Sequence, residues 1–199
     1  MIYRFCRAVL RLLSRIYFRH TAVGAEQLPS RGGYLLAVNH ASFLDPVLVG
    51  IAVKAPISFL ARSTLFRPAP WGWFLRAVHA VPFDREGVGM AGFRCVIERL
   101  KAGSPVLVFP EGTRTRDGHI GRTRPGVLKL AQLANVPVVP TLLVGSFGAL
   151  GRGALVPRPV RTQVRFGAAF AVEPGQDLEV ALSAIERAWQ ELGATASEK

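Results

Sequence analysis

The feature that most constrains the fold of this chain is its short, uninterrupted apolar runs. Residues 34–38 and 106–109 are apolar at every position, and glycine or proline bounds each run. A strand of this kind has to be covered on both faces, which is typical of a parallel sheet between helices. The sequence therefore predicts an α/β fold in which a mostly parallel central sheet is flanked by helices.

The rest of the chain alternates between strands and helices in the same way. Further strands are expected over residues 57–61, 79–83, 136–144 and 162–166, and helices over 92–101, 126–134 and 178–192. The last of these helices has one apolar face, which is expected to point inward: Leu178, Leu182, Ile185, Trp189 and Leu192. With 199 residues and no internal repeat or low-complexity linker, the chain is expected to form a single domain.

Two segments leave alternatives open. Residues 62–74 mix arginines with aromatic side chains, which suits either a membrane interface or acyl-chain groove, or a short helix that covers the sheet. Residues 145–161 are rich in glycine, proline and arginine, and form a long connection that either flanks the site or touches a membrane.

A histidine and an aspartate follow the first apolar run. His40 lies in the loop after the expected strand, and Asp45 lies where a helix begins, directly before Pro46. We predict that Asp45 is the N-cap of this helix and that its carboxylate also orients the His40 ring, so that the second ring nitrogen can take a proton from a hydroxyl. The residues alone leave open whether His40 is a base or a structural residue. Ser42 lacks the surroundings of a nucleophile elbow, so we assign it a hydrogen-bonding role in the loop.

The second apolar run also ends in a polar loop. Residues 110–118 read Pro-Glu-Gly-Thr-Arg-Thr-Arg-Asp-Gly. Gly112 lets the backbone approach a ligand, and the planar guanidinium of Arg114 suits a phosphate. Glu111 is expected to orient that arginine or to accept a hydrogen bond from a hydroxyl. A surface ion pair would explain the end of this loop, but not the part that directly follows a core strand.

Four short blocks occur in order along most of the chain, at residues 39–45, 81–85, 109–114 and 136–140. Their sequences are Asn-His-Ala-Ser-Phe-Leu-Asp, Val-Pro-Phe-Asp-Arg, Phe-Pro-Glu-Gly-Thr-Arg and Val-Pro-Val-Val-Pro. By these blocks the chain resembles the 1-acylglycerol-3-phosphate acyltransferase family. The resemblance implies transfer of a fatty acyl group from an acyl thioester to the free hydroxyl of a lysophospholipid. The favoured acceptor is 1-acylglycerol 3-phosphate, and the product is phosphatidic acid.

The same resemblance implies roles for particular residues. His40 and Asp45 would be the catalytic pair, acting without a covalent enzyme intermediate. The arginines of the second and third blocks would face the phosphate, among these substrate-binding positions: Arg85, Glu111, Gly112, Thr113 and Arg114. It implies neither a metal nor a cofactor, because the acyl donor, acyl-CoA or acyl carrier protein, is a substrate.

Two departures from the family pattern concern the head group of the acceptor. The basic residue before Gly126 is commonly a lysine in the family, whereas here it is Arg124. The second block often has an upstream glycine, whereas here residues 78–80 are Val-His-Ala. Acylation of another lysolipid by the same mechanism therefore stays open as an alternative.

The first 20 residues are expected to form an amphipathic membrane-interface helix, and residues 21–199 the catalytic domain. Arginines recur along one helix face: Arg4, Arg7, Arg11, Arg15 and Arg19. Such a helix is typical of a membrane interface, although a terminal helix that packs on the domain shows the same pattern. No apolar stretch reaches the roughly 18 residues of a membrane span, so we expect peripheral attachment to the cytoplasmic face of the cell membrane.

The formal net charge of +12 favours anionic partners. Charge alone is compatible with nucleic acid, but the four blocks favour an anionic membrane surface, a lysophospholipid acceptor and a thioester donor, with no nucleic acid. Cys6 and Cys95 form neither a disulfide framework nor a metal-binding spacing, which favours a reducing compartment.

Two functions of other classes remain as alternatives. Gly87, Gly89 and Gly92 match the glycine fingerprint of dinucleotide-binding proteins, which would make the chain a nicotinamide-dependent oxidoreductase. Against this, charged residues separate these glycines from the preceding strand, where the phosphate-binding turn should begin at once. A non-enzymatic membrane-surface adaptor would explain the charge and the arginine pattern, but it leaves the histidine–aspartate pair unexplained.

Overall fold

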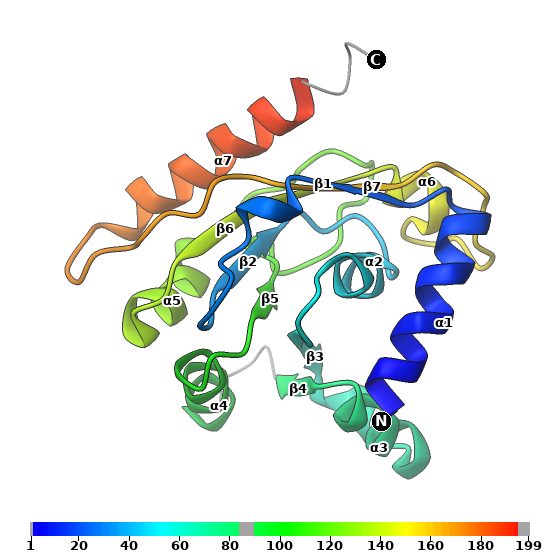
Figure 1. Cartoon of the computed structure of the whole chain (residues 1–199), viewed down its shortest axis with the longest axis horizontal. Coiled ribbons are helices and arrows are strands. Elements are labelled where there is room, and N and C mark those ends of the chain that lie inside the picture. The colour runs from blue at the N-terminus through cyan, green and yellow to red at the C-terminus, as the bar shows by residue number, and fades with distance from the viewer. Residues whose placement is uncertain (1, 84–89, 195–199) are drawn as a thin grey trace.

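The computed structural model describes residues 2–83 and 90–194 (Figure 1). Within these ranges, seven strands form one sheet in the order β1-β7-β6-β2-β5-β3-β4. The strands are β1 (Thr21–Val23), β2 (Leu35–Val38), β3 (Ser58–Arg62), β4 (Ala80–Phe83), β5 (Val106–Val108), β6 (Val138–Val144) and β7 (Gln163–Phe166).

Helices connect most of these strands. The α-helices are α1 (Ile2–Tyr17), α2 (Asp45–Ala52), α3 (Ala69–Ala77), α4 (Met90–Lys101), α5 (Lys129–Ala134), α6 (Ser146–Leu150) and α7 (Leu178–Ala194). Three short 3-10 helices complete the described elements: η1 (Ala25–Gln27), η2 (Ser63–Phe66) and η3 (Pro125–Leu128).

The sheet is parallel except at one pairing. β2 lies near its centre and pairs in parallel with β5 and with β6. β1–β7, β3–β4 and β3–β5 are also parallel, and β6–β7 is antiparallel. The predicted α/β domain with a mostly parallel central sheet is confirmed.

The central strand shows why its apolar run is uninterrupted. Leu35 and Ala37 belong to the core beneath α4, α5 and α7, whereas Leu36 and Val38 belong to the core beneath α2. All four side chains are completely buried. Figure 1 shows α4, α5 and α7 on one side of the sheet and α1 and α2 on the other. Because helices cover both faces, no position of β2 is left for a polar residue.

The C-terminal helix α7 is anchored on the same strand. Leu182, Ile185 and Trp189 are buried, and the two outer residues of the predicted inward face pack against the same cluster. The indole Nε1 of Trp189 donates a hydrogen bond to the carbonyl of Ala37 at 3.3 Å. Truncating a buried tryptophan typically costs about 3–5 kcal/mol. α7 therefore stabilises the strand that leads directly into the loop of His40.

Some elements differ from the prediction. β1 and α6 were not expected, and the expected helix 126–134 is divided into η3 and α5. The segment 62–74 contains features of both open interpretations. It folds as η2 and most of α3 with Phe66 buried, as a covering helix would, but Trp71 and Trp73 remain exposed.

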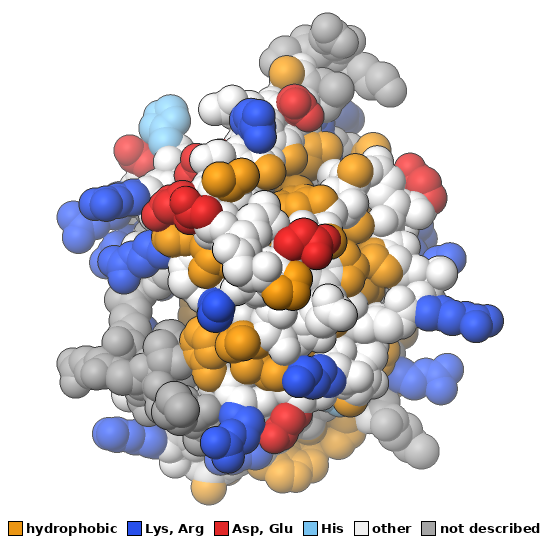
Figure 2. Space-filling model, turned by 90° about the vertical axis from the view of Figure 1, so that its left-hand side faces the viewer, with side chains coloured by type: hydrophobic (Ala, Val, Ile, Leu, Met, Phe, Trp, Pro, Cys, Tyr) orange, Lys and Arg blue, Asp and Glu red, His pale blue; other side chains and the backbone are white. Residues whose placement is uncertain are grey.

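The side of the molecule that carries α4, α5 and α7 faces the viewer in Figure 2. Charged side chains of both signs are interspersed there with small apolar areas, as on an ordinary solvent-facing surface. None of the helices in the described part of the chain is long and apolar enough to cross a bilayer.

Candidate active site

Two loops meet at the carboxyl edge of the sheet. Because β2 and β5 are parallel neighbours, the loop after β2 (residues 39–44) and the loop after β5 (residues 109–124) leave the sheet at the same edge. The main-chain N–H of Thr115 joins them by donating to the carbonyl of His40 at 2.9 Å. This edge is where parallel α/β sheets place their ligand sites.

The structure brings His40 and Asp45 into direct contact. Nδ1 of His40 lies 2.8 Å from Oδ2 of Asp45, which is completely buried. The same oxygen accepts the main-chain N–H groups of Ala41 and Ser42, each at 2.7 Å. The predicted contact between the ring and the carboxylate is confirmed. The carboxylate also holds the main chain of the loop between His40 and Asp45.

The predicted N-cap role of Asp45 is wrong. Leu44 is the N-cap of α2 and makes no side-chain capping bond, while Asp45 is the first helical residue and Pro46 follows it. The physical reason lies in the direction of the side chain. It turns back toward the N–H groups of the preceding loop instead of forward into the first turn of the helix.

The hydrogen bond to Asp45 determines which nitrogen of His40 can accept a proton. Since a carboxylate only accepts, Nδ1 carries the one hydrogen of the neutral ring, which leaves the lone pair on Nε2. No hydrogen bond to Nε2 is found in the described part of the chain, and the His40 side chain is 18% exposed. Nε2 of His40 is therefore open to a ligand, a geometry that a general base requires, and the catalytic role of His40 stays a prediction.

Two residues that the sequence did not indicate hold His40 in place. The Phe109 ring stacks on the His40 ring, with centroids 3.7 Å apart and an angle of 14° between the planes. The side chain of Asn39 pairs with the main chain of Leu143, accepting its N–H at 2.7 Å and donating to its carbonyl at 3.1 Å. Asn39 thereby extends the β2–β6 pairing by one residue. Its place as the first polar residue after a buried strand was the available signal.

Glu111 joins the two loops through the main chain. One carboxylate oxygen accepts the N–H of His40 at 2.6 Å, and the other accepts the N–H of Gly121 at 2.7 Å. The side chain is buried. Burial raises the pKa of the Glu111 carboxyl, and the two N–H donors oppose that rise. The geometry gives Glu111 a positioning role, while its assignment to substrate binding stays a prediction.

The other predicted substrate-binding residues occupy the same loop. Gly112 has φ of 64°, a conformation that favours glycine, and both it and Thr113 are exposed. Arg114 is half-buried, and its guanidinium lies 5.4 Å from the centroid of the Phe43 ring. The loop thus brings Arg114 against the segment that contains His40. Arg85 lies outside the described residues.

Ser42 has the loop role that the sequence suggested. Its hydroxyl donates to the carbonyl of Leu150 at 2.7 Å and accepts the N–H of Leu44 at 3.1 Å. These bonds connect the loop of His40 to the end of α6. Ser42 is completely buried and engaged in this way, so it serves as a structural residue.

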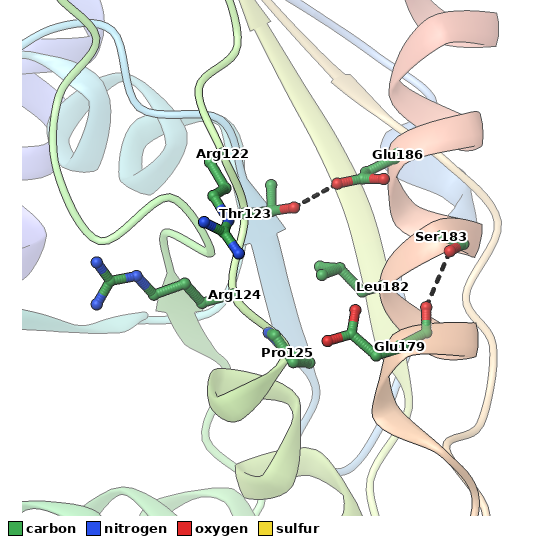
Figure 3. A pocket seen from close by; sticks show the side chains of 8 residues that line it. All are labelled: Arg122, Thr123, Arg124, Pro125, Glu179, Leu182, Ser183 and Glu186. Atoms are coloured by element: carbon green, nitrogen blue, oxygen red, sulfur yellow. Dashed lines mark hydrogen bonds between the residues drawn. The ribbon is translucent and has the colours of Figure 1, made fainter.

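A hollow of about 690 Å³ lies beyond the Glu111 loop, where residues 122–125 face α7 (Figure 3). The hydroxyl of Thr123 donates to Glu186, which ties the end of the loop to the helix. Figure 3 shows the side chain of Arg124 directed away from α7. None of the described residues of the predicted site lines this hollow. Its contribution to the site is the attachment of the loop to α7.

The acyltransferase family model matches residues 19–144, more than half of the chain. The 1-acyl-sn-glycerol-3-phosphate acyltransferase of Bacillus subtilis (strain 168) is 32% identical over 146 residues, which cover 72% of this chain and 72% of that protein. The chloroplastic 1-acyl-sn-glycerol-3-phosphate acyltransferase BAT2 of Brassica napus is 31% identical over 134 residues. That match covers 65% of this chain and 38% of the plant protein.

A solved structure shows the same fold. The crystal structure of the 1-acyl-sn-glycerophosphate (LPA) acyltransferase PlsC from Thermotoga maritima superposes with a TM-score of 0.77 at 22% identity, covering 96% of this chain and 81% of that one. With the family model and the Bacillus relative in agreement, the chain belongs to the acyltransferase family, among the 1-acylglycerol-3-phosphate acyltransferases.

Proposed function

We propose that the protein transfers a fatty acyl group from an acyl thioester to the free hydroxyl of 1-acylglycerol 3-phosphate, which yields phosphatidic acid. The observation that carries this proposal is the 2.8 Å hydrogen bond between His40 and Asp45, which leaves Nε2 of the histidine open to a substrate. The names of the relatives in Bacillus and Brassica support this acceptor.

The reaction follows from the orientation of the histidine. Nε2 of His40 takes the proton of the acceptor hydroxyl as its oxygen attacks the thioester carbonyl carbon. A C–O bond forms, and the tetrahedral intermediate then collapses as the C–S bond breaks. The departing thiolate takes the proton from the imidazolium, which restores neutral His40. Asp45 holds the ring and stabilises its positive charge between the two steps.

The phosphate of the acceptor is assigned to Arg85 and Arg114, and Gly112 and Thr113 are further proposed substrate-binding residues. A guanidinium presents a planar fork of N–H donors that matches a phosphate. Arg114 lies over the Phe43 ring in the loop that contains His40, which supports its placement close to the reacting hydroxyl. In this scheme Glu111 contributes by fixing the main chain of both loops.

The acyl donor is acyl-CoA or acyl carrier protein. Both present the same thioester group, so the role of His40 is the same with either one. The donor is a substrate in this scheme, which assigns no resident cofactor. An anionic donor of either kind is compatible with the net charge of +12.

Peripheral attachment to the cytoplasmic face of the cell membrane completes the proposal. α1 has an exposed apolar strip, in which Phe5 and Ile16 are 70% and 71% exposed. The strip consists of Phe5, Val9, Leu12, Leu13 and Ile16, which share one helix face. An apolar strip beside arginines is typical of a helix that lies in a membrane interface. Lysolipid and product both reside in a bilayer, so such attachment would bring the enzyme to its substrate.

Product identification tests the proposal. Purified protein is given a panel of lysolipids that differ in head group, with acyl-CoA or with acyl carrier protein as the donor, and the products are identified by mass spectrometry. We expect phosphatidic acid as the main product. If a different lysolipid is acylated preferentially, that lysolipid is the acceptor, and the proposed mechanism is unchanged. Vesicle binding without transfer to any acceptor would indicate an adaptor, and nicotinamide-dependent oxidation would indicate an oxidoreductase.

A further inference from the structure

The connection between α6 and β7 carries an exposed apolar tip. We call residues 151–161 the outer loop; its sequence is Gly-Arg-Gly-Ala-Leu-Val-Pro-Arg-Pro-Val-Arg. Leu155 is 95% exposed and Val156 is 71% exposed, although both are large apolar residues. These two side chains have no role in the proposed reaction and are not part of the hydrophobic core.

Main-chain hydrogen bonds, one of them to α6, hold the outer loop. The N–H of Arg158 donates to the carbonyl of Ala149 at 2.8 Å, and the N–H of Ala154 donates to the carbonyl of Gly151 at 3.2 Å. Val160, at the far end, packs against the core beneath α2. The apolar tip is therefore presented to the outside by a loop whose two ends are fixed.

The outer loop is also joined to α1 and to the active site. The hydroxyl of Tyr17, the last residue of α1, donates to the carbonyl of Pro157 at 2.9 Å. Figure 1 shows the loop beside the C-terminal end of α1. At its other end, Leu150 accepts the hydroxyl of Ser42 from the loop of His40. The exposed apolar tip thus lies next to the end of α1, and the outer loop begins directly after a residue that is hydrogen-bonded to the loop of His40.

The charge of this region has one sign. Residues 1–25 and 146–172 contain no aspartate or glutamate. Arg152, Arg158 and Arg161 of the outer loop are exposed, and so are Arg4, Arg11 and Arg15 of α1. A surface that combines exposed apolar side chains with arginines and lacks acidic groups is complementary to an anionic bilayer. A nucleic acid would match the arginines but would leave Leu155 and Val156 in water.

We propose that the outer loop is a second lipid-contacting element, which inserts Leu155 and Val156 into an anionic bilayer next to α1. This inference rests on the proposed function, because it assumes that the substrate is reached at a membrane. A single helix lying in the interface leaves the domain free to roll about the helix axis. A second contact beside the helix removes that freedom. It also holds the loop of His40 close to the bilayer surface, because Ser42 of that loop is bonded to Leu150, directly before the outer loop.

Vesicle flotation of the Leu155→Asn/Val156→Asn variant tests this inference. The matched control is Leu133→Asn/Val180→Asn, which exchanges side chains 48% and 56% exposed on α5 and α7, across the sheet. With vesicles of phosphatidylcholine and phosphatidylglycerol, we expect the outer-loop variant to lose about tenfold to a hundredfold in partitioning, since two apolar side chains no longer insert. The control should partition like the wild type.

Activity separates this inference from the proposed function. The outer-loop variant should lose activity on acceptor embedded in vesicles and keep wild-type activity on acceptor dispersed in detergent. Wild-type flotation of Leu155→Asn/Val156→Asn, or equal losses in the control, would overturn the inference. Leu155→Ala/Val156→Ala should show a smaller loss in the same direction, which guards against a folding defect. If the wild type transfers no acyl group in either assay, the proposed function fails. Flotation alone then shows whether the outer loop contacts lipid.

Discussion

At the scale of single residues, Glu111 shows how one carboxylate can join the two loops of the site. Its oxygens accept N–H bonds from His40 and from Gly121, which lie on different loop segments. The approach is close, since a Cβ added at Gly121 would lie 3.0 Å from a Glu111 oxygen. Glu111 therefore fixes the main chain at His40, and it also fixes the main chain at Gly121, in the loop that contains Arg114.

Replacing Glu111 by glutamine tests this joining role. An amide has one acceptor oxygen, so one main-chain N–H would face an NH2 group. We expect Glu111→Gln to lower the free energy of unfolding by about 1–3 kcal/mol and to lower kcat, because His40 is no longer held. Thermal denaturation and steady-state kinetics measure both effects. Glu98→Gln, at an exposed position of α4, is the control. Wild-type stability and kcat in Glu111→Gln would contradict the role.

Arg114 is expected to decide how well a phosphorylated acceptor is used. Loss of one charge-assisted contact typically costs about 1.5–3 kcal/mol, so Arg114→Ala should weaken use of 1-acylglycerol 3-phosphate by roughly tenfold to more than a hundredfold. Arg114→Lys should keep more of this activity than Arg114→Ala but less than the wild type, because lysine keeps the charge and lacks the planar fork of N–H donors. Kinetics with a monoacylglycerol, which lacks the phosphate, give the comparison. Equal losses on both acceptors would mean that Arg114 holds the structure or the donor.

The contact between His40 and Asp45 could be predicted from the sequence, but its full geometry could not. The five-residue spacing at the end of an apolar strand indicated that Asp45 could reach His40. The same pattern suggested an N-cap, because aspartate before proline usually starts a helix. Whether the carboxylate turns forward to the helix or back to the loop depends on the path of residues 41–44, which no local pattern specifies.

At the scale of elements, α1 presents three different faces. It packs on the domain through Tyr3, whose hydroxyl accepts the N–H of Ile57 at 3.2 Å, and through Arg7, which donates to the carbonyl of Lys54. The apolar strip lies on a second face and is exposed. The remaining arginines, Arg4, Arg11 and Arg15, lie on a third face. The helix therefore packs on the domain, as one sequence interpretation expected, and its exposed apolar strip leaves the membrane-interface interpretation a prediction.

The exposed arginines of α1 should govern how binding to vesicles depends on salt. Each basic residue near an anionic surface contributes about 1 kcal/mol, screened over a Debye length. We expect Arg4→Gln/Arg11→Gln/Arg15→Gln to release the protein from anionic vesicles and to make binding less sensitive to salt. Flotation at low and high salt measures this.

A control for the α1 arginines removes the same charge from the other side of the sheet. Arg94→Gln/Lys101→Gln/Arg187→Gln exchanges exposed residues of α4 and α7. If this variant and the α1 variant lose binding equally, net charge rather than α1 determines attachment. If neither loses binding, the arginines of α1 form a solvated face.

His20 is expected to make the stability of the junction between α1 and β1 depend on pH. Its ring is buried, with Nδ1 2.8 Å from the hydroxyl of Thr162, and burial lowers the pKa of His20 below 6.5. A lowered folded-state pKa means that the contribution to stability is complete above pH 6.5 and is lost as the pH falls through the folded-state value.

We therefore expect the melting temperature to fall on acidification below pH 6.5, by about 2–4 °C for each kcal/mol lost. The melting temperature of His20→Gln should fall less steeply with decreasing pH. His79→Gln is measured in parallel, because burial also lowers the pKa of His79. An unchanged pH profile in His20→Gln would show that this junction does not titrate in the stability transition.

The longer elements could be predicted because their patterns repeat within the element. The apolar runs of β2 and β5 and the inward face of α7 were each recognised from several consecutive positions. β1 and α6 comprise 3 and 5 residues, too few for a periodic pattern to appear. α3 was left between two interpretations because it buries Leu75 and exposes Trp71 and Trp73, so its apolar residues do not lie on one face.

At the scale of the whole molecule, the strand order determines which residues meet at the site. β2 lies between β5 and β6, so residues far apart in the sequence meet around the loop of His40. Glu111 comes from the β5 side, and Leu143 and Leu150 come from the β6 side. The sequence predicted a mostly parallel sheet without its strand order. The contacts of Asn39 and Phe109 therefore could not be anticipated, although the residues themselves stand beside the recognised blocks.

The two sides of the molecule have different surfaces. α4, α5 and α7 carry charges of both signs among small apolar areas. α1 and the outer loop, on the other side, combine arginines with exposed apolar residues and contain no acidic residue. This asymmetry supports the proposal that α1 and the outer loop contact an anionic bilayer. The loop of His40 is bonded through Ser42 to Leu150, directly before the outer loop.

Exchange of His40 tests the central claim most directly. Purified wild-type protein and His40→Ala are given 1-acylglycerol 3-phosphate and an acyl thioester, and the rate of phosphatidic acid formation is measured by mass spectrometry. Equal melting temperatures establish that the variant is folded. We expect the wild type to form phosphatidic acid and His40→Ala to be slower by about a hundredfold to ten-thousandfold, the usual value of general-base assistance. Wild-type turnover in folded His40→Ala would contradict the assignment of His40 as the base.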